Sequence, residues 1–275
     1  MNVELPILFE DEHVVVVMKP AGVVVNRSHT HQTDTVQDWM EKTYPQLFTT
    51  IDEVTEETQL FLDRSGIAHR LDKDTSGILL CAKTPQSLAQ LFSQFKQRQI
   101  RKTYLALVHG KLIPSEGEIN LPLGRDSKFR LRFAVREGGR ESQTLYKTLH
   151  FFPHFQIDLF EKQKDRPEFT SNLQGQSKNF RRAIKSYQGF SLVELHPLTG
   201  RTHQIRVHMS HLHHPLVGDQ LYGGKRRQVL DMMWCPRHFL HAAELIFNHP
   251  ISGEVVTVKS SLPKDLVEVL KYVEV

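Results

Sequence analysis

The sequence predicts an α+β protein in which helices flank a mixed, mainly antiparallel β-sheet. Two observations favour this class: short strand-like segments outnumber helical ones, and several of them form hairpin-sized pairs separated by turn residues. The chain has 275 residues, of which 39% are hydrophobic and 24% are charged, as in ordinary soluble globular proteins. We therefore expect one domain over residues 1–275, with an exposed insertion at residues 161–188, where the sequence is polar and contains Pro, Asn and Gly.

The first strands are expected in the valine-rich stretch Ile7–Met18, which predicts a hairpin with its turn at Asp11 and Glu12. The segment KPAG, residues 19–22, then ends the hairpin, because proline and glycine interrupt a strand. Further strands are expected at Gly77–Lys83, Thr103–Leu112, Glu118–Leu123, Arg130–Val135, Thr144–Phe152, Gly189–His196, Ala243–Pro250 and Gly253–Ser260.

Helices are expected where cap residues precede an apolar stripe. Thr35 caps a short helix ending at Tyr44, and Thr84 followed by Pro85 begins a second helix. In this second helix Leu88, Leu91, Phe92 and Phe95 recur at the spacing of one helical face. The remaining expectations are helices at Arg201–His211 and Leu266–Val273, and a polar, acidic loop at Thr49–Leu62.

Charge and cysteine content indicate a weak preference for polyanions and a reducing compartment. The formal net charge is +4, and basic clusters occur at residues 96–102, 128–140, 179–185 and 225–227, two of them interleaved with phenylalanine. Solvated surface is the alternative interpretation of any single cluster. The two cysteines, Cys81 and Cys235, form no CxxC pair, and the N-terminal residues lack the pattern of a signal peptide. We expect a soluble cytoplasmic protein that does not bind membranes.

The segment HRLDKDTSG places Asp72 directly before an apolar run. A carboxylate beside a buried strand costs free energy unless another group pairs with it. Asp72 is therefore either a structural acid that stabilises a turn with Thr75, Ser76 and Gly77, or a residue kept for chemistry.

Two more segments carry candidate site residues. In GRTHQIRVH, Arg201 and Arg206 lie near the start of an expected helix, and a guanidinium brought to Asp72 would keep that carboxylate ionised and oriented. In KTYLALVHG, Tyr104 lies on an apolar strand, either as a core residue or as an acid–base group or a stacking surface for a base.

The histidine-rich stretch HMSHLHHPLVGD raises the possibility of a metal site. His208, His211, His213 and His214 are close in sequence, but HExxH, clustered cysteines and a carboxylate in register are absent from the sequence. We therefore expect no metal. Sequence motifs of protein kinases, P-loop nucleotide hydrolases and serine hydrolases are also absent.

Taken together, four segments resemble the RluA-type pseudouridine synthases: VVVVMKPAGVVV, HRLDKDTSGILLCAK, RKTYLALVHGK and LVELHPLTGRTHQIRVHMSHLHHPLVGDQLYG. They occur in the family's order, from Ile7 to the strands after His241. The resemblance implies the fold of that family, a mixed and mainly antiparallel sheet with a central catalytic cleft. It also implies an isomerase that converts specific uridines in tRNA, large-subunit rRNA or both to pseudouridine, without a cofactor, a nucleotide or a metal.

The resemblance further implies three catalytic residues. Asp72 would be the catalytic carboxylate, acting on C1′, on C6 or through a glycal route. Tyr104 would stack on the target base and take the C5 proton, and Arg206 would pair with Asp72.

Four substrate-binding residues follow from the same motifs, and a group of RNA contacts is expected in the insertion. Ile205 would line the uracil pocket, and Arg70 would fill the space left by the flipped base. His69 and Arg201 are expected to contact the substrate as well. Candidates for binding the RNA backbone lie in the predicted insertion: Arg181, Arg182 and Lys185.

Many relatives carry an S4 RNA-binding module before the catalytic domain, whereas we expect none here because the first family strand begins within about ten residues of Met1. We expect a monomer with RNA as its partner. The alternative is a non-catalytic RNA-binding or RNA-folding protein on the same scaffold, and a metal-dependent nuclease built on the histidines is a third hypothesis.

Overall fold

The computed structural model describes residues 3–28, 31–49, 55–163, 183–184 and 186–274. Contacts within the chain define two compact units. The first unit consists of residues 1–102 and 242–261, and the second of residues 103–241 and 262–275. The single domain over residues 1–275 stays a prediction, and most of the predicted insertion at 161–188 lies outside the described residues.

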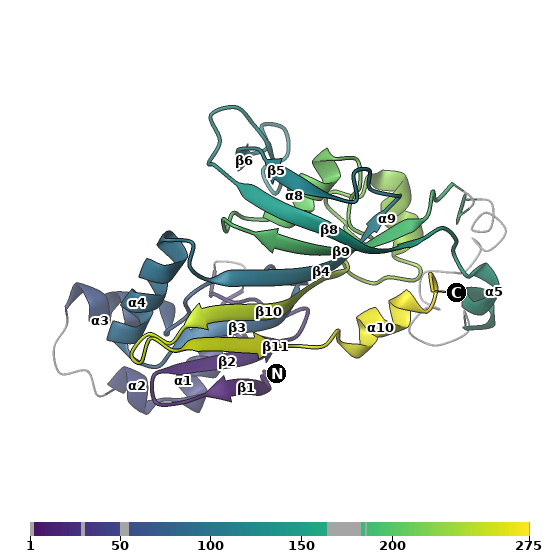
Figure 1. The fold of residues 1–275 in the computed structure, drawn as a ribbon. Coiled ribbons are helices and arrows are strands. Elements are labelled where there is room, and N and C mark those ends of the chain that lie inside the picture. Colours follow the sequence, from purple (N-terminus) through teal and green to yellow (C-terminus); the bar gives the residue numbers. More distant parts are fainter. Residues whose placement is uncertain (1–2, 29–30, 50–54, 164–182, 185, 275) are drawn as a thin grey trace. The chain divides into compact units, whose positions relative to one another are not determined.

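The first unit contains strands β1, β2, β3 and β10 in that order, with β11 paired to β10 (Figure 1). Their bounds are Ile7–Glu10, Val14–Lys19, Ser76–Ala82, Leu240–Asn248 and Val255–Lys259. The hairpin expected at Ile7–Met18 is confirmed as the antiparallel pair β1–β2. Its turn is closed by Asp11, whose Oδ1 accepts hydrogen bonds from the His13 and Val14 amides at 2.7 and 2.8 Å.

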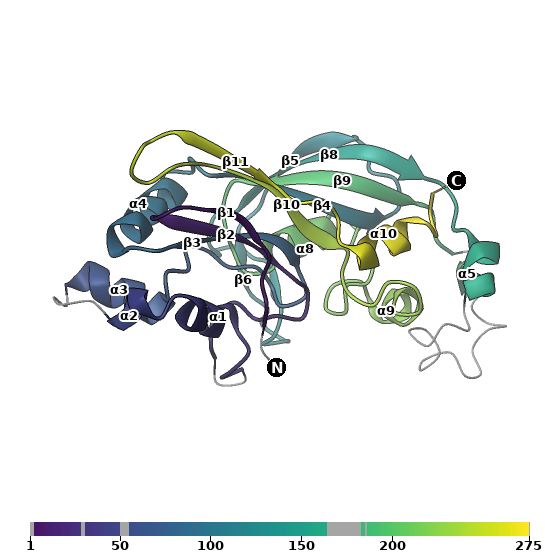
Figure 2. The same ribbon diagram turned by 90° about the horizontal axis from the view of Figure 1, so that it is seen from below.

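Helices α1, α2 and α3 lie on one face of strands β1 to β3 (Figure 2). The helices of this unit are α1 Val36–Thr43, α2 Gln46–Thr49, α3 Glu56–Arg64 and α4 Pro85–Lys96. The two expected helices are confirmed: Thr35 caps α1 in a capping box with Asp38, and Thr84 caps α4 ahead of Pro85. The apolar face of α4 joins a core that includes Leu88 and Leu91.

The expected loop at Thr49–Leu62 is wrong over its second half, where α3 forms. Thr55 caps this helix by accepting a hydrogen bond from the Thr58 amide. Glu56 and Glu57 in the first turn stabilise the helix because their negative charges lie at the positive end of its dipole. One apolar side chain, Phe61, is fully buried from it. A helix with so narrow an apolar stripe gives almost no periodic signal in the sequence.

The second unit contains strands β4, β9, β8 and β5 in that order, and a separate hairpin formed by β6 and β7. Their bounds are β4 Arg101–His109, β5 Glu116–Asn120, β6 Leu123–Arg125, β7 Phe133–Val135, β8 Gln143–Phe152 and β9 Phe190–Pro197. The β4–β9, β9–β8, β8–β5 and β6–β7 pairs are all antiparallel. The predicted α+β class with a mainly antiparallel sheet is confirmed.

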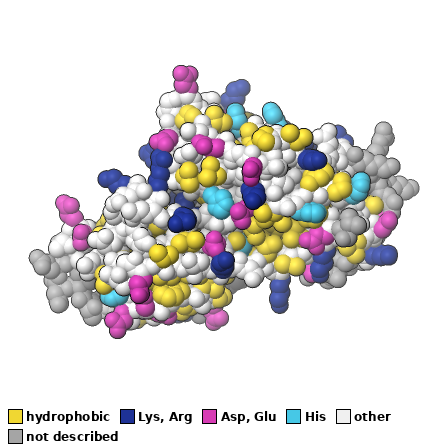
Figure 3. Space-filling view, viewed as in Figure 1, with side chains coloured by type: hydrophobic (Ala, Val, Ile, Leu, Met, Phe, Trp, Pro, Cys, Tyr) yellow, Lys and Arg dark blue, Asp and Glu magenta, His cyan; other side chains and the backbone are white. Residues whose placement is uncertain are grey.

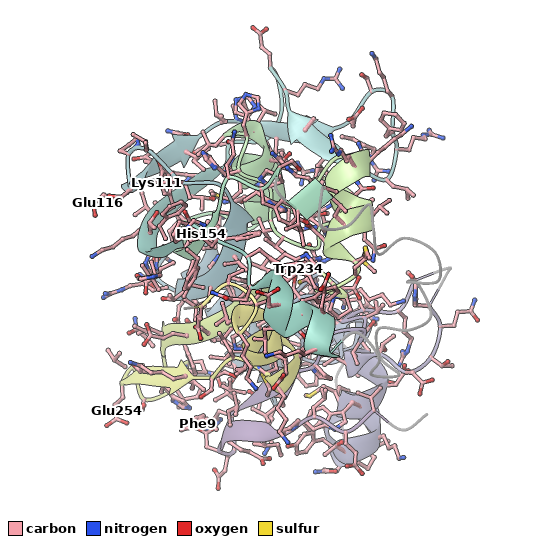
Figure 4. All side chains as sticks on the ribbon, turned by 90° about the vertical axis from the view of Figure 1, so that its right-hand side faces the viewer. Phe9, Lys111, Glu116, His154, Trp234 and Glu254 are labelled. Atoms are coloured by element: carbon pink, nitrogen blue, oxygen red, sulfur yellow. The ribbon has the colours of Figure 1, made fainter. Side chains whose placement is uncertain are left out.

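The helices of the second unit are α5 Ile157–Gln163, α8 Gln204–His211, α9 Lys225–Asp231 and α10 Lys264–Leu270. Its core forms around Trp234, which is fully buried near α5, whereas Lys111 and Glu116 project outward (Figure 4). Phe155 meets the Trp234 ring edge-on at 5.0 Å, and both belong to an aromatic cluster with Phe190 and Tyr272.

Two expected elements of this unit begin later than the sequence indicated. The strand expected at Arg130–Val135 is β7, which starts only at Phe133, because the Arg132 amide donates to the Phe129 carbonyl at 2.8 Å and closes a turn over residues 129–132. The helix expected at Arg201–His211 is α8, which starts at Gln204 because His203 adopts a left-handed backbone conformation with φ 55°.

Candidate active site

The loop that carries Asp72 directly precedes β3 in the first unit. The segment before it runs antiparallel to β3, with Ala82 donating to the Gly66 carbonyl at 2.7 Å and Ala68 to the Leu80 carbonyl at 3.2 Å. Asp72 itself is half-buried, and its carbonyl accepts a hydrogen bond from the Thr75 amide at 3.1 Å. The carboxylate therefore lies in a short closed turn directly ahead of a fully buried strand.

The side chain of His69 makes the last hydrogen bond between this segment and β3. Its Nε2 accepts a hydrogen bond from the Leu80 amide at 3.1 Å, and its ring packs against Phe95 with centroids 5.2 Å apart. Burial, together with the nearby charge of Lys102, lowers the pKa of His69 to about 3, so the ring is neutral and accepts at neutral pH. Burial likewise lowers the pKa of Lys102 to about 8. The substrate-binding role of His69 stays a prediction.

Lys19 fastens the same loop from β2. Its buried Nζ donates to the carbonyls of Pro20, Val23 and Lys73, each at 2.9 Å. The Lys73 carbonyl also accepts from the Gly22 amide at 2.9 Å. Lys73 follows Asp72 directly, so two donors from the KPAG segment fix the backbone on the C-terminal side of the candidate catalytic carboxylate.

Gly77 shows why the TSG sequence is needed here. The expected turn with Thr75, Ser76 and Gly77 is shifted by two residues, because the turn lies at Lys73 and Asp74 and β3 begins at Ser76. Gly77 has φ +125°, and a Cβ at this position would lie 2.3 Å from the Ala242 carbonyl oxygen. Glycine thus permits the close approach of β10 that holds the start of β3.

Arg206 belongs to the second unit and is held by an acid that the sequence analysis did not single out. Its Nε and Nη2 donate to the two carboxylate oxygens of Asp219 at 2.7 and 2.9 Å. Side-chain exposures of 6% and 0% make this a buried bidentate ion pair. Burial alone would raise the pKa of Asp219, but the hydrogen bonds and charge of Arg206 hold it below its ordinary value. The sequence did contain a signal that could have identified Asp219. The acid follows the apolar pair Leu216–Val217 and Gly218, and Asp72 is likewise an acid placed beside an apolar run.

The side-on contact with Asp219 determines where Arg206 can act. A planar guanidinium bound through Nε and Nη2 directs its other edge, with Nη1, away from that carboxylate. This geometry lets the arginine address a second anionic group while its first contact is kept. The predicted pairing of Arg206 with Asp72 joins residues of different units and stays a prediction.

Polar side chains dock α8 on β8 and so fix the helix that carries Arg206. Gln204 donates to the Gln143 carbonyl and to Thr144 Oγ1, both at 2.9 Å, and accepts from Thr199 and from the Arg201 amide. Four satisfied hydrogen bonds on one buried amide allow a single orientation of the helix.

The other predicted residues of this unit lie on α8, on β4 and in the turn before α8. Ile205 is buried at 6% exposure, and Tyr104 lies on β4 at 9% exposure opposite Leu195. Arg201 lies before α8, with its Nε donating to the Glu141 carbonyl at 2.9 Å. In the first unit, Arg70 is exposed. The binding and catalytic roles of these four residues stay predictions, and Arg181, Arg182 and Lys185 lie outside the described residues.

The histidine-rich stretch contributes packing contacts. His208 is fully buried, with Nδ1 bonded to Thr144 and Nε2 to Ser142, and His214 Nδ1 pairs with the His109 carbonyl at 2.8 Å. In the part of the chain that the structure describes, no three His, Cys, Asp or Glu side chains gather in a way that could hold a metal ion.

The first unit thus holds Asp72 in a closed turn, and the second unit holds Arg206 in a buried ion pair. Residues 13–211 match the family model described as RNA pseudouridylate synthase, and the chain belongs to this family. The RNA pseudouridine synthase predicted from the sequence motifs is thereby confirmed at the level of the family.

Several curated relatives match nearly the whole chain. The ribosomal large subunit pseudouridine synthase D of Xanthomonas campestris is 33% identical over 96% of this chain and 68% of its own length. The protein with the same description from Nitrosomonas europaea is 34% identical over 98% of this chain and 66% of its own length. The uncharacterized RNA pseudouridine synthase YlyB of Bacillus subtilis is 34% identical, with 98% and 72% covered. The chain thus spans about two thirds of the length of these relatives.

Solved structures agree on the fold. Human RNA pseudouridylate synthase domain containing 1 superposes with a TM-score of 0.64 at 26% identity, covering 94% of this chain and 84% of that one. Human RNA pseudouridylate synthase domain containing 4 superposes with a TM-score of 0.62 at 21% identity, covering 97% of this chain and 92% of that one, and it shows the fold alone.

The helices of the described segments are all too short or too polar to cross a lipid bilayer. The predicted cytoplasmic location stays a prediction.

Proposed function

We propose that the chain isomerises specific uridines to pseudouridine in large-subunit ribosomal RNA, with Asp72 as the catalytic carboxylate. The observation that carries this proposal is the coincidence of a family match over residues 13–211 with a closed turn that holds Asp72 and is fastened by Lys19 at the Lys73 carbonyl. The descriptions of two relatives as ribosomal large subunit synthases favour ribosomal RNA over tRNA.

The proposed reaction breaks the bond between N1 of uracil and C1′ of the ribose and forms a bond between C5 and C1′. C5 loses a proton and N1 gains one, so atoms and charge balance without an oxidant or reductant. Attack at C1′, attack at C6 and a glycal route all require a carboxylate at this position. Tyr104 would take the C5 proton, and Arg206 would keep Asp72 ionised while Asp219 holds the arginine in place.

RNA contact is proposed for the basic and aromatic surface of the second unit. In the β6–β7 hairpin the guanidinium of Arg132 lies 5.0 Å from the centroid of Phe129, whose side chain is 57% exposed. Arg125 lies 5.7 Å from the centroid of Phe133. Such pairs offer a base a stacking surface beside a positive charge. The basic side chains visible in Figure 3 are otherwise scattered among acidic and uncharged ones.

Three exposed basic residues of α9, Lys225, Arg226 and Arg227, add a second source of phosphate contacts. The target uridine must leave its base stack to reach a half-buried carboxylate, and phosphate contacts on either side would hold the strand while it does so.

The experiment is tritium release from RNA that carries 5-³H-uridine, with large-subunit rRNA and tRNA supplied as separate unmodified pools. Wild type is expected to release tritium from the ribosomal pool, and Asp72→Asn is expected to release none while unfolding at the wild-type temperature. Asp74→Asn is the matched control, because Asp74 is a half-buried acid of the same turn. Its rate is expected within about threefold of wild type.

Release from tRNA alone would replace the proposed substrate. Equal cellular rescue by wild type and Asp72→Asn would favour the alternative of a non-catalytic RNA-binding protein.

A further inference from the structure

The hydroxyl of one tyrosine bonds the β6–β7 hairpin to the segment that follows α8. Tyr222 Oη accepts a hydrogen bond from the Phe133 amide of β7 at 2.9 Å. The same hydroxyl pairs with His203 Nδ1 at 2.9 Å, and the hydroxyl proton can be donated to that nitrogen. The His203 ring meets Phe133 edge-on at 6.0 Å and Tyr222 at 5.7 Å, so the three side chains form one contact.

The ring of the same tyrosine contacts Arg206. The guanidinium carbon lies 5.2 Å from the Tyr222 ring centroid, within the range of a cation–π interaction. Asp219 places the ring there, because its Oδ1 accepts from the Leu221 and Tyr222 amides at 2.9 and 3.0 Å while binding Arg206. The turn closes with the Gly223 amide on the Asp219 carbonyl at 2.9 Å. Asp219 thus fixes the positions of both the Arg206 guanidinium and the Tyr222 ring that contacts it.

The hairpin held by the hydroxyl exposes groups suited to RNA. Its tip, residues 126–132, carries Lys128, Arg130 and Arg132, and Phe129 and Leu131 are 57% and 80% exposed. Two short strands of three residues each give such a hairpin little stability of its own. Its position therefore depends on contacts such as the one from Phe133 to Tyr222.

We propose that Tyr222 is a positioning residue with two functions: its hydroxyl fixes the β6–β7 hairpin, and its ring fixes the guanidinium of Arg206. A single side chain thereby fixes the position of the hairpin that holds RNA relative to the arginine that serves the reaction. This inference rests on the proposed function for the roles of Arg206 and of the hairpin, whereas the contacts that carry it lie within the second unit.

The first test is hydrogen–deuterium exchange without RNA. In Tyr222→Phe the ring stays and the hydroxyl is lost, so the Phe133 amide loses its acceptor and is expected to exchange about tenfold faster. The matched control is Tyr187→Phe, which removes a hydroxyl bonded to Asp231 at 2.6 Å in the same unit. Exchange at Phe133 is expected to be unchanged in this control. An unchanged rate in Tyr222→Phe would overturn the role of the hydroxyl.

The second test separates the ring from the hydroxyl. In protein labelled with ¹⁵N-arginine, the Arg206 Nε–H resonance, assigned with Arg206→Lys, is expected to move in Tyr222→Leu and to stay in Tyr222→Phe. The same pattern is expected in tritium release: Tyr222→Phe raises KM about tenfold with kcat changed less than threefold, and Tyr222→Leu also lowers kcat at least tenfold.

Equal resonances and equal kcat values in the two variants would overturn the role of the ring. If wild type releases no tritium from any RNA pool, the proposed function fails, and amide exchange and the arginine resonance still decide whether Tyr222 holds the two parts. If Tyr222→Leu does not fold, Tyr222→Phe still tests the proposal through exchange.

Discussion

Replacing Lys19 by methionine is expected to destabilise the first unit by about 2 kcal/mol. Methionine fills a similar volume but donates no hydrogen bonds, so the carbonyls of Pro20 and Val23 each lose the Nζ donor that lies 2.9 Å away. These two bonds are part-buried, so each carbonyl that loses its donor costs roughly 1 kcal/mol. The Lys73 carbonyl loses Nζ as well but keeps the Gly22 amide, so its loss adds less.

The assay is urea unfolding of Lys19→Met, with Lys83→Met as the matched control. Lys83 also lies in the first unit and bonds the Asp11 carbonyl at 2.7 Å and Glu10 at 3.0 Å, but Glu10 is exposed to solvent. Its replacement is expected to cost about 1 kcal/mol. If Lys19→Met lost no more stability than Lys83→Met, the argument that the ammonium holds the Asp72 loop through three carbonyls would be refuted.

Three further outcomes are expected. Burial lowers the pKa of His208 to about 4, so protonation favours the unfolded chain, and its contribution to stability, full above pH 6.5, is lost as pH falls toward 4. His208 should contribute up to about 1.4 kcal/mol per pH unit to the fall in the free energy of unfolding over that window. In urea titrations at each pH, His208→Asn should remove this share of the slope, while the share from His69, whose pKa is also lowered, remains. Arg206→Ala is expected to abolish most tritium release with RNA affinity within about threefold, and a large loss of binding with normal turnover would contradict its pairing role. Replacing Arg130 and Arg132 by glutamine should weaken RNA binding and reduce the slope of log affinity against log salt in filter binding. Neutralising Arg181, Arg182 and Lys185 should have the same effect. If the slope is unchanged in either variant, the residues replaced in that variant do not belong to the RNA interface.

Local sequence signals predicted the elements whose causes are local. The caps at Thr35 and Thr84 and the turn at Asp11 involve partners within three residues, and each was found where the sequence placed it. The helix α3 was missed because its amphipathic stripe rests on little more than Phe61. The start of α8 was missed because His203 takes a left-handed backbone conformation, and its ring bonds Tyr222, which lies nineteen residues further along the chain.

The candidate site divides in the same way. Motifs singled out Asp72 and Arg206, but the groups that hold them were found only in the structure. Lys19 reaches the Lys73 carbonyl across 54 positions of sequence, and Asp219 reaches Arg206 across 13. A basic residue in KPAG and an acid in LVGD carry no periodic pattern that would reveal such partners. Charged residues placed directly beside apolar strands were the usable signal in both cases.

The late arrival of β10 has a consequence for synthesis on the ribosome. β3 lies beside β10 in the first unit, and Gly77 is shaped to the backbone of Ala242. A nascent chain therefore carries β1, β2 and β3 with the edge of β3 that faces β10 still lacking that strand while residues 103–239 are being translated. That edge is a ready template for pairing with another chain, so nascent or truncated forms ending before Leu240 should need chaperone protection that the complete polypeptide does not.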